Sequence, residues 1–240
     1  MMILNSYFKQ SKSPFYSFIF ILPLFVIYEF GISAISSKDL PTIRNGADVL
    51  LRKILATVGI SGIYGMAMFL LIGIIITFLI NKGEFRKLKF KGNYFIFMIF
   101  ESILWSVILF IILSQGQLLL GKGTAKLLIQ QIVLSIGSGI FEEFVFRVVL
   151  VSSFALIVGL FFKKQYFYKM SFAVIVAAVI FSLFHFIGDY ADIPKTSLFI
   201  LRFTAGIILG YIYILRGFGI AAYSHSFYNL IVFTQTIPDS

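Results

Sequence analysis

Residues 127–162 read LLIQQIVLSIGSGIFEEFVFRVVLVSSFALIVGLFF, an almost uninterrupted apolar stretch that contains Glu142, Glu143 and Arg147. Such a stretch is typical of a membrane-spanning helix, which needs about 20 apolar residues to cross the hydrocarbon core. A charged side chain near the bilayer centre costs at least ~2.5–3.5 kcal/mol, so charges there usually mark a functional site. The stretch therefore predicts a membrane protein and the place of its site.

The composition of the whole chain agrees with this prediction. Of its 240 residues, 60% are hydrophobic and only 12% are charged, unlike a soluble domain. Backbone groups in lipid need internal partners and the alternation of a β-barrel is absent, so the crossings must be helices. We predict one all-α polytopic membrane domain over residues 1–240, with about seven transmembrane helices at Phe15–Ile35, Ile60–Ile80, Tyr94–Leu113, Leu127–Phe162, Ser171–Ile187, Leu198–Leu215 and Phe218–Ile237.

The fourth predicted crossing is too long for a straight helix across the membrane. From Leu127 to Phe162 it would measure ~54 Å at about 1.5 Å per residue. It must tilt, bend or continue along the membrane surface. We predict a bend near Ser152-Ser153 or Gly159.

Residues 48–58, between the first two predicted crossings, place Asp48, Arg52 and Lys53 among leucine, isoleucine and valine at helical spacing. This pattern predicts a short helix that lies in the membrane interface. A surface anchor is the simpler role for it, and a lid over the site is the alternative.

The net charge of +10 is unevenly distributed. Five lysines and arginines between residues 82 and 91 indicate a cytoplasmic loop beside anionic lipids, so membrane lipids rather than nucleic acid are the expected partner. Eleven basic residues in the predicted inner loops against seven in the outer ones favour a cytoplasmic amino terminus and an outer carboxyl terminus. The bias toward Lys, Ile and Phe suggests an A·T-rich bacterial genome and hence a bacterial cell membrane.

The charged trio in the fourth crossing has a spacing that predicts its pairing. Residues four apart share a helix face, so Glu143 and Arg147 should pair, while Glu142 lies about 100° from Glu143 and faces elsewhere. Arginine suits this role because its guanidinium holds a carboxylate with two hydrogen bonds. The alternative is that all three residues form a structural clamp.

The two histidines of the chain also lie in the carboxyl-terminal half. His185 stands at the end of the fifth crossing, and His225 and Asn229, four residues apart, share a face of the last one. A lone histidine in a crossing is more often a packing residue, but two beside a glutamate pair favour a site. The chain has no cysteine, which excludes a cysteine nucleophile and thiolate metal sites.

The order Glu142-Glu143-x-x-x-Arg147, Phe181-x-x-x-His185, His225-x-x-x-Asn229 resembles the CPBP family of intramembrane proteases, also called Abi. That family includes the CAAX prenyl endopeptidases and bacterial proteins linked to bacteriocin processing and self-immunity. The resemblance covers residues 127–237, which would form the catalytic core, and implies an endopeptidase. Val148 stands where many relatives have glycine.

The residue types allow two mechanisms. In the first, Glu142 and His185 position and deprotonate a water, while His225 and Asn229 stabilise the oxyanion. This resembles the glutamate-activated-water mechanism proposed for the prenyl endopeptidases and requires no cofactor. In the second, Glu142, His185 and His225 bind a catalytic zinc, although the His-Glu-x-x-His signature is absent. We favour the first.

The expected substrate is a small membrane-associated peptide or protein precursor, such as a bacteriocin or signalling peptide, cleaved near its carboxyl terminus or leader. One alternative is a non-enzymatic membrane scaffold or bacteriocin self-immunity protein of the same fold. A transporter is the weaker alternative, because inverted repeats and paired helix interruptions are not evident. Glu29 and Glu101 either bind a cation or substrate or, at least as readily, pair with interior polar groups.

Overall fold

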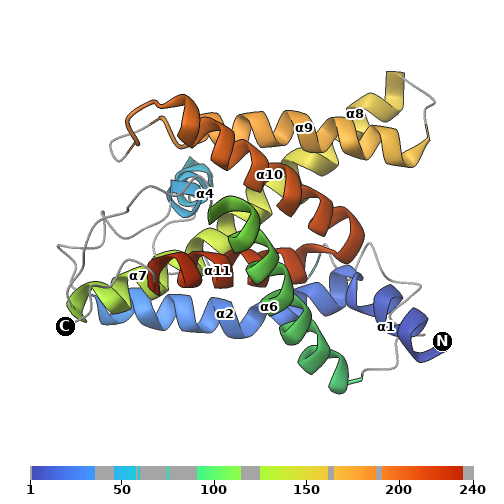
Figure 1. The fold of residues 1–240 in the computed structure, drawn as a ribbon, viewed down its shortest axis with the longest axis horizontal. Helices are drawn as coiled ribbons and strands as arrows, with labels where there is room; N and C mark the ends of the chain where they lie inside the picture. The colour runs from blue at the N-terminus through green and yellow to red at the C-terminus, as the bar shows by residue number, and fades with distance from the viewer. Residues whose placement is uncertain are drawn as a thin grey trace.

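The computed structural model describes residues 2–35, 46–57, 59, 75, 91–114, 125–161, 165–187 and 191–234. The regular elements of these ranges are all helical, as Figure 1 shows. In chain order they are α1 (Met2–Ser11), α2 (Pro14–Ala34), α4 (Gly46–Thr57), α6 (Asn93–Leu113), α7 (Ala125–Gly137), η2 (Ser138–Glu142), η3 (Phe144–Val151), α8 (Ser152–Phe161), α9 (Tyr166–Phe184), α10 (Thr196–Arg216) and α11 (Phe218–Thr234).

Five helical stretches are long and apolar enough to cross a membrane: Pro14–Ala34, Asn93–Leu113, Leu128–Phe161, Tyr166–Phe184 and Thr196–Arg216. By length and composition they agree with five of the predicted crossings, and the described elements confirm the all-helical fold. The predicted crossing Ile60–Ile80 lies, apart from residue 75, outside the described residues. Helix α11 has 17 residues, the lower end of the length that spans a bilayer. The count of seven stays a prediction.

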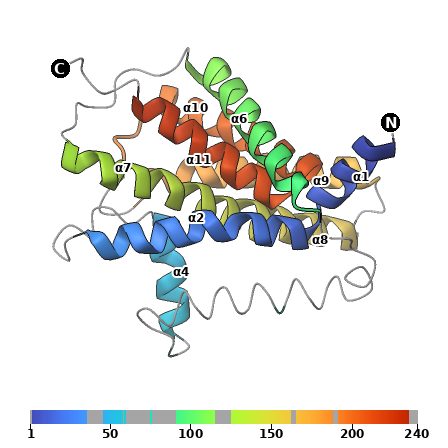
Figure 2. The ribbon, with the colours of Figure 1, turned by 90° about the horizontal axis from the view of Figure 1, so that it is seen from below.

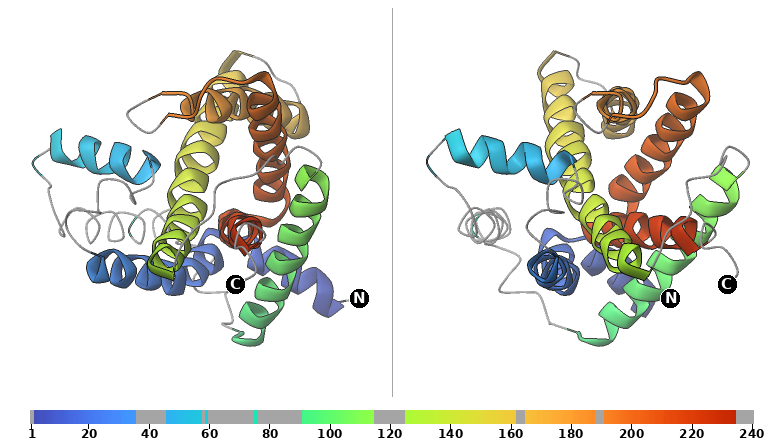
Figure 3. Two further views of the ribbon diagram at one scale, coloured as in Figure 1. Left: turned by 60° about the vertical axis from the view of Figure 1, so that its left-hand side comes forward. Right: turned by 90° about the vertical axis from the view of Figure 1, so that its left-hand side faces the viewer.

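The long apolar stretch forms one continuous helical column from α7 through η2 and η3 to α8, visible as the lime-to-yellow segment of Figure 3. Its middle, residues 138–151, is wound largely as π-helix. A π-helix has i→i+5 hydrogen bonds, is rare, and often occurs at functional sites. The bend was predicted near Ser152-Ser153 or Gly159. The change in helix winding lies before these residues, at 138–151, and α-helical winding resumes with α8 at Ser152.

Helix α11 lies at the centre of the bundle. It packs against α2, α6, α7 and η2, and Figures 1 and 2 show α2, α7 and α11 running side by side. The rings of Phe20 on α2 and Tyr223 on α11 stack with centroids 4.1 Å apart. Elsewhere in the bundle, α9 and α10 approach closely because Gly206 of α10 faces Ala178 of α9. This packing brings the π-helical column, the end of α9 and α11 together.

Helix α1 was not predicted from the sequence. It is held by a partly buried set of residues that we call the Glu101 cluster: Tyr7, Phe8, Ser11, Glu101 and Arg216. Arg216 Nη2 donates to Glu101 Oε2 and to Ser11 Oγ, both at 2.8 Å, and Nη1 donates to Phe8 O at 3.2 Å. The Tyr7 hydroxyl donates to Glu101 Oε2 at 2.6 Å. Glu101 therefore pairs with interior polar groups and joins α1, α6 and α10.

Helix α4 corresponds to the predicted interfacial helix. Its Asp48 is fully buried and accepts hydrogen bonds from Tyr28 of α2 and from Arg52, both at 2.7 Å. Arg52 also forms an ion pair with Glu29 at 3.1 Å. Ile54 on the other face is exposed, and Figure 2 shows α4 projecting from the body beside α2. These polar contacts anchor α4 to α2, and Glu29 takes part in them through its ion pair with Arg52.

Candidate active site

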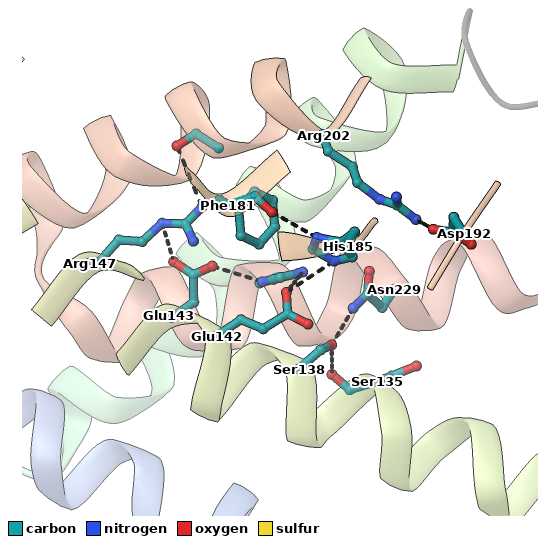
Figure 4. Close-up of polar contacts among 12 residues, drawn as sticks. Ser135, Ser138, Glu142, Glu143, Arg147, Phe181, His185, Asp192, Arg202 and Asn229 are labelled. Atoms are coloured by element: carbon teal, nitrogen blue, oxygen red, sulfur yellow. Dashed lines mark hydrogen bonds and ion pairs between the residues drawn. The ribbon is translucent and has the colours of Figure 1, made fainter. Parts of the chain in front are cut away.

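The six residues predicted from the sequence come from three parts of the fold: Glu142, Glu143 and Arg147 from the π-helical segment, His185 from the residue after α9, and His225 and Asn229 from α11. Figure 4 labels five of them, Glu142, Glu143, Arg147, His185 and Asn229, and shows their side chains in one polar cluster. Glu142, Glu143, Arg147 and His225 are each no more than 6% exposed. The structure thus gathers residues up to 87 positions apart, from 142 to 229, in an apolar interior.

Both glutamates contact the ring of His225. Its Nδ1 lies 2.8 Å from Glu143 Oε1, and its Nε2 lies 3.9 Å from Glu142 Oε2. This corrects the expectation that Glu142 faces away from Glu143. In the wider π-helical turn, successive residues rotate through a smaller angle than in an α-helix, so neighbouring side chains can reach the same partner.

Glu143 and Arg147 form the expected ion pair. Arg147 Nε lies 3.1 Å from Glu143 Oε2, and both side chains are almost completely buried. The guanidinium also lies 4.7 Å from the centre of the Phe181 ring, a cation–π contact. One oxygen of Glu143 therefore faces Arg147 and the other faces His225. Glu143 links the ion pair to the histidine and is more than a partner for arginine.

His185 is oriented by its own helix. Its Nδ1 lies 2.8 Å from the Phe181 carbonyl, which can only accept, so Nδ1 carries a proton. Its Nε2 points toward Glu142 Oε2 at 3.9 Å, the same oxygen that His225 Nε2 faces at the same distance. Both separations exceed the ~2.7–3.2 Å of a direct hydrogen bond. Polar groups at separations above about 3.5 Å can be bridged by a water.

Asn229 joins the cluster through a residue that the sequence analysis missed. Its Nδ2 donates to Ser138 Oγ at 2.5 Å, and Ser138 Oγ donates to the Ser135 carbonyl at 3.0 Å. The sequence offered one signal for Ser138. Its hydroxyl lies four residues, about one helical turn, before Glu142, so the two side chains can share a helix face.

Gly139 allows the π-helical segment to approach α11. A Cβ atom at this position would lie 2.5 Å from the Ala222 carbonyl oxygen and would also meet the Ser226 side chain. No side chain fits there, so only glycine permits this contact. The close approach brings Glu142 and Glu143 within reach of His225.

The donor set has the chemistry of a zinc site without the arrangement of a preformed one. Within the described ranges, no group of three or more His, Asp or Glu side chains has metal-site geometry. The types are nevertheless suitable, since Glu142, His185 and His225 offer a carboxylate and two Nε2 atoms. Each Nδ1 is held by a carbonyl or a carboxylate, as is usual for histidine ligands of metals.

Comparison with known proteins gives one match. A family model described as Rce1-like, type II CAAX prenyl endopeptidase, matches residues 124–231. No curated protein and no solved structure matches the chain. The matched region begins beside α7 and ends within α11, so it contains every residue of the cluster.

Proposed function

Residues 124–231 belong to the CPBP family of CAAX-type proteases, and on this premise we propose that the protein is an intramembrane endopeptidase. Its substrate would be a small membrane-associated peptide or protein precursor. The observation that carries the proposal is the convergence of His185 Nε2 and His225 Nε2 on Glu142 Oε2. A protein that served only as a scaffold would have no need to bury this arrangement in an apolar interior.

In the proposed mechanism, a water bound between Glu142 Oε2 and His185 Nε2 is the nucleophile. Glu142 accepts one proton from the water while the water oxygen attacks the carbonyl carbon of the scissile peptide bond. The proton then passes to the departing amide nitrogen. The carbon–nitrogen bond breaks to give a carboxyl group and an amine, so one water is consumed in each cleavage.

The orientation of the His225 ring supports an oxyanion role for it. Its Nδ1 lies 2.8 Å from Glu143 Oε1, while its Nε2 turns toward Glu142 Oε2. The contact with Glu143 fixes the ring, and an oxyanion donor acts only when it is held in place before the charge develops. In this orientation Nε2 would face the oxyanion.

Asn229 would supply the second oxyanion donor. Its amide nitrogen has two N–H bonds, of which one donates to Ser138. We assign the other to the oxyanion. Ser138 would then fix the rotation of the amide, since a donor acts only when it is held in place before the charge develops.

A zinc-dependent mechanism is the second candidate. It is favoured by the fixed Nδ1 atoms of His185 and His225, which leave both Nε2 atoms facing Glu142. These three residues would hold the metal, and zinc when bound acts as a Lewis acid on water or carbonyl. In this case Glu143 would orient and strengthen His225 as a ligand.

A bacterial peptide precursor, such as a bacteriocin or signalling peptide, remains our preferred substrate. Membrane lipids would be the other partner, with the amino terminus in the cytoplasm and the carboxyl terminus outside. A non-enzymatic scaffold or bacteriocin self-immunity protein of the same fold is the rival function. The two functions differ in one measurable respect: only the protease requires the Glu142 carboxylate.

The test compares membrane peptides from hosts that express the wild type or Glu142→Gln, identified by mass spectrometry. We expect a precursor to accumulate uncut with the variant and to be cut with the wild type. Glu29→Gln is the matched control, because it makes the same chemical change in the α4 anchor, away from the cluster. Identical peptides from all three hosts would favour the scaffold.

A further inference from the structure

The turn between α1 and α2 carries Lys12, a cation outside the hydrogen bonds of the Glu101 cluster. It lies close enough to Arg216 for the two positive charges to repel each other. Arg216 pairs with Glu101, whereas no carboxylate in the described ranges forms an ion pair with Lys12. Burial, and then the repulsion from Arg216, lowers the pKa of the Lys12 ammonium. An anion bound beside Lys12 would offset both effects.

The backbone of this turn is held in place, which distinguishes Lys12 from an ordinary surface lysine. Gly217, the residue after α10, packs directly against it: a Cβ atom there would lie 2.7 Å from the Lys12 carbonyl oxygen. On the other side, the Ser13 N–H donates to the Gln10 carbonyl at 2.9 Å, and Ser13 Oγ accepts from the Tyr16 N–H at 3.3 Å. A ligand of Lys12 therefore has to order only the side chain, which lowers the cost of binding.

The turn lies where three helices that can cross a membrane begin or end. Helix α2 begins at Pro14, α6 begins at Asn93 and α10 ends at Arg216, and each is long and apolar enough to cross. Helix α1 contacts α2 and α6, and Figures 1 and 2 show it beside them at one end of the molecule. The ends of crossing helices reach the headgroup region of a bilayer. Phospholipid phosphates are therefore the anions expected at the level of Lys12.

Phe8 adds an apolar surface beside the two cations. Its ring centre lies 4.4 Å from Arg216 Cζ, and 45% of the residue is exposed. Lys9, the next residue, is exposed and brings a further positive charge. Arg216 contributes its charge alone, because its N–H groups already donate within the Glu101 cluster. An anionic phospholipid has the matching parts, since its phosphate suits the ammonium and its acyl chain suits the ring.

We propose that the corner formed by Phe8, Lys9, Lys12 and Arg216 binds one anionic phospholipid, with its phosphate on Lys12 and an acyl chain against Phe8. This inference goes beyond the proposed function, because the binding needs no cleavage. It also goes beyond the general attraction of basic loops to the membrane, because it places one lipid at a defined position. A zwitterionic lipid fits less well, since its headgroup would bring another cation to a corner that already repels one.

The test counts lipids on the purified full-length protein. The wild type is titrated with phosphatidylglycerol or with phosphatidylcholine of the same acyl chains, and native mass spectrometry gives the affinity of the first bound lipid. We expect phosphatidylglycerol to bind roughly 10-fold more tightly, the lower end of the range for a hydrogen bond to a charged group. It should also raise the midpoint of thermal unfolding more, because it binds the folded protein. Glycerol phosphate, which lacks acyl chains, should not compete at the same concentration.

Three variants assign this preference to Lys12. Lys12→Gln should bind the two lipids equally, and its binding of phosphatidylcholine and its size-exclusion profile would show that it is folded. Without lipid it should unfold at the same temperature as the wild type or higher, because a repulsive charge is gone. Lys12→Arg should keep the preference. Lys195→Gln is the matched control, since it removes a lysine at the opposite end of α10, and it should also keep the preference.

Four results would overturn the inference. The first is equal affinity of the wild type for the two lipids. The second is a preference that survives Lys12→Gln. The third is an equal loss of preference in Lys195→Gln, which would show an effect of overall charge. The fourth is competition by glycerol phosphate as strong as that by phosphatidylglycerol, which would assign the corner to a soluble phosphate instead of a lipid.

Discussion

The Glu101 cluster and the candidate active site both contain charged residues in the interior of the described structure, and the two clusters are built differently. In the Glu101 cluster, Arg216 donates from all three of its nitrogens to Glu101, Ser11 and the Phe8 carbonyl at direct hydrogen-bond contact. Burial, together with the hydrogen bond to Glu101, raises the pKa of Tyr7 and keeps its hydroxyl a donor. In the candidate active site, Glu142 Oε2 faces two histidine nitrogens at 3.9 Å, too far for direct bonds.

This difference separates a structural cluster from a reactive one. Direct contacts among all members satisfy buried polar groups and join helices, which is the requirement of a fold. A catalytic centre must instead leave a position for a water and a substrate carbonyl between its groups. The active-site cluster contains both close and longer contacts, because Glu143 and Arg147 are 3.1 Å apart while Glu142 Oε2 lies 3.9 Å from each histidine Nε2.

The same substitution at the two clusters gives the largest expected contrast. Glu142→Gln should lower kcat by at least about 10²–10⁴, the usual contribution of a general base, with near-normal folded yield. Glu101→Gln should lower the folded yield, because Arg216 loses its charged partner, while each folded molecule keeps its activity. Cleavage rates of purified protein and the monodisperse fraction on size-exclusion chromatography measure the two effects. Comparable losses of activity per folded molecule would erase the distinction.

The two buried arginines provide the second contrast. Arg147→Ala leaves Glu143 buried without its cation and should cost up to ~3–5 kcal/mol of stability, and it should also impair activity through His225. Arg216→Ala should cost a similar amount and leave activity per folded molecule intact. Thermal unfolding in detergent, with cleavage measured below the transition, separates the two. Normal stability and yield of Arg147→Ala would show that the Glu143–Arg147 ion pair does not stabilise the fold.

His225→Ala distinguishes the two mechanisms of the active site. As an oxyanion donor, its loss should reduce kcat by about 10²–10³ and leave metal content unchanged. The proposed mechanism also expects far less than one zinc per chain and cleavage that survives long incubation with a chelator. Elemental analysis and chelation assays check both statements. The zinc mechanism would be established if the wild type contains stoichiometric zinc that His225→Ala lacks, and if a chelator abolishes cleavage that added zinc restores. The assignment as a protease would stand in that case.

Ser138→Ala should have the smallest effect, because it removes the group that orients Asn229 and leaves the amide itself in place. We expect a decrease in kcat of about tenfold, the value of one ordinary hydrogen bond, with little change in KM. Ser135→Ala is the matched control, since it keeps the backbone carbonyl that Ser138 uses. Ser138→Thr should recover part of the loss. An unchanged kcat in Ser138→Ala would remove Ser138 from the site.

Much of the fold could be predicted because hydrophobic length is a local property. The crossings at Tyr94–Leu113 and Leu198–Leu215 agree closely with α6 and α10, since a run of about 20 apolar residues has few alternatives in lipid. The pairing of Glu143 with Arg147 followed equally from spacing along one helix. Helix α1 was missed because it is short, and its stability depends on distant Glu101 and Arg216.

The relation of Glu142 to Glu143 could not be predicted by the same reasoning. Helical spacing assumes α-helical winding, whereas residues 138–151 are wound largely as π-helix. The close approach of Gly139 to α11 belongs to the same arrangement, and it involves residues about 80 positions away. Likewise, Ser138 is unremarkable in the sequence until α11 brings Asn229 to its hydroxyl.

The sequence by itself determined that this protein is a helical membrane protein with charges in its apolar interior and a protease-like order of motifs, because these features depend on composition and local spacing. Only the tertiary structure decided that both histidines turn Nε2 toward one oxygen of Glu142, and that Glu143 contacts Arg147 and His225 at once. Such contacts depend on helix winding and on the packing of α9 and α11 against the π-helical segment, which residues far apart in the chain fix together.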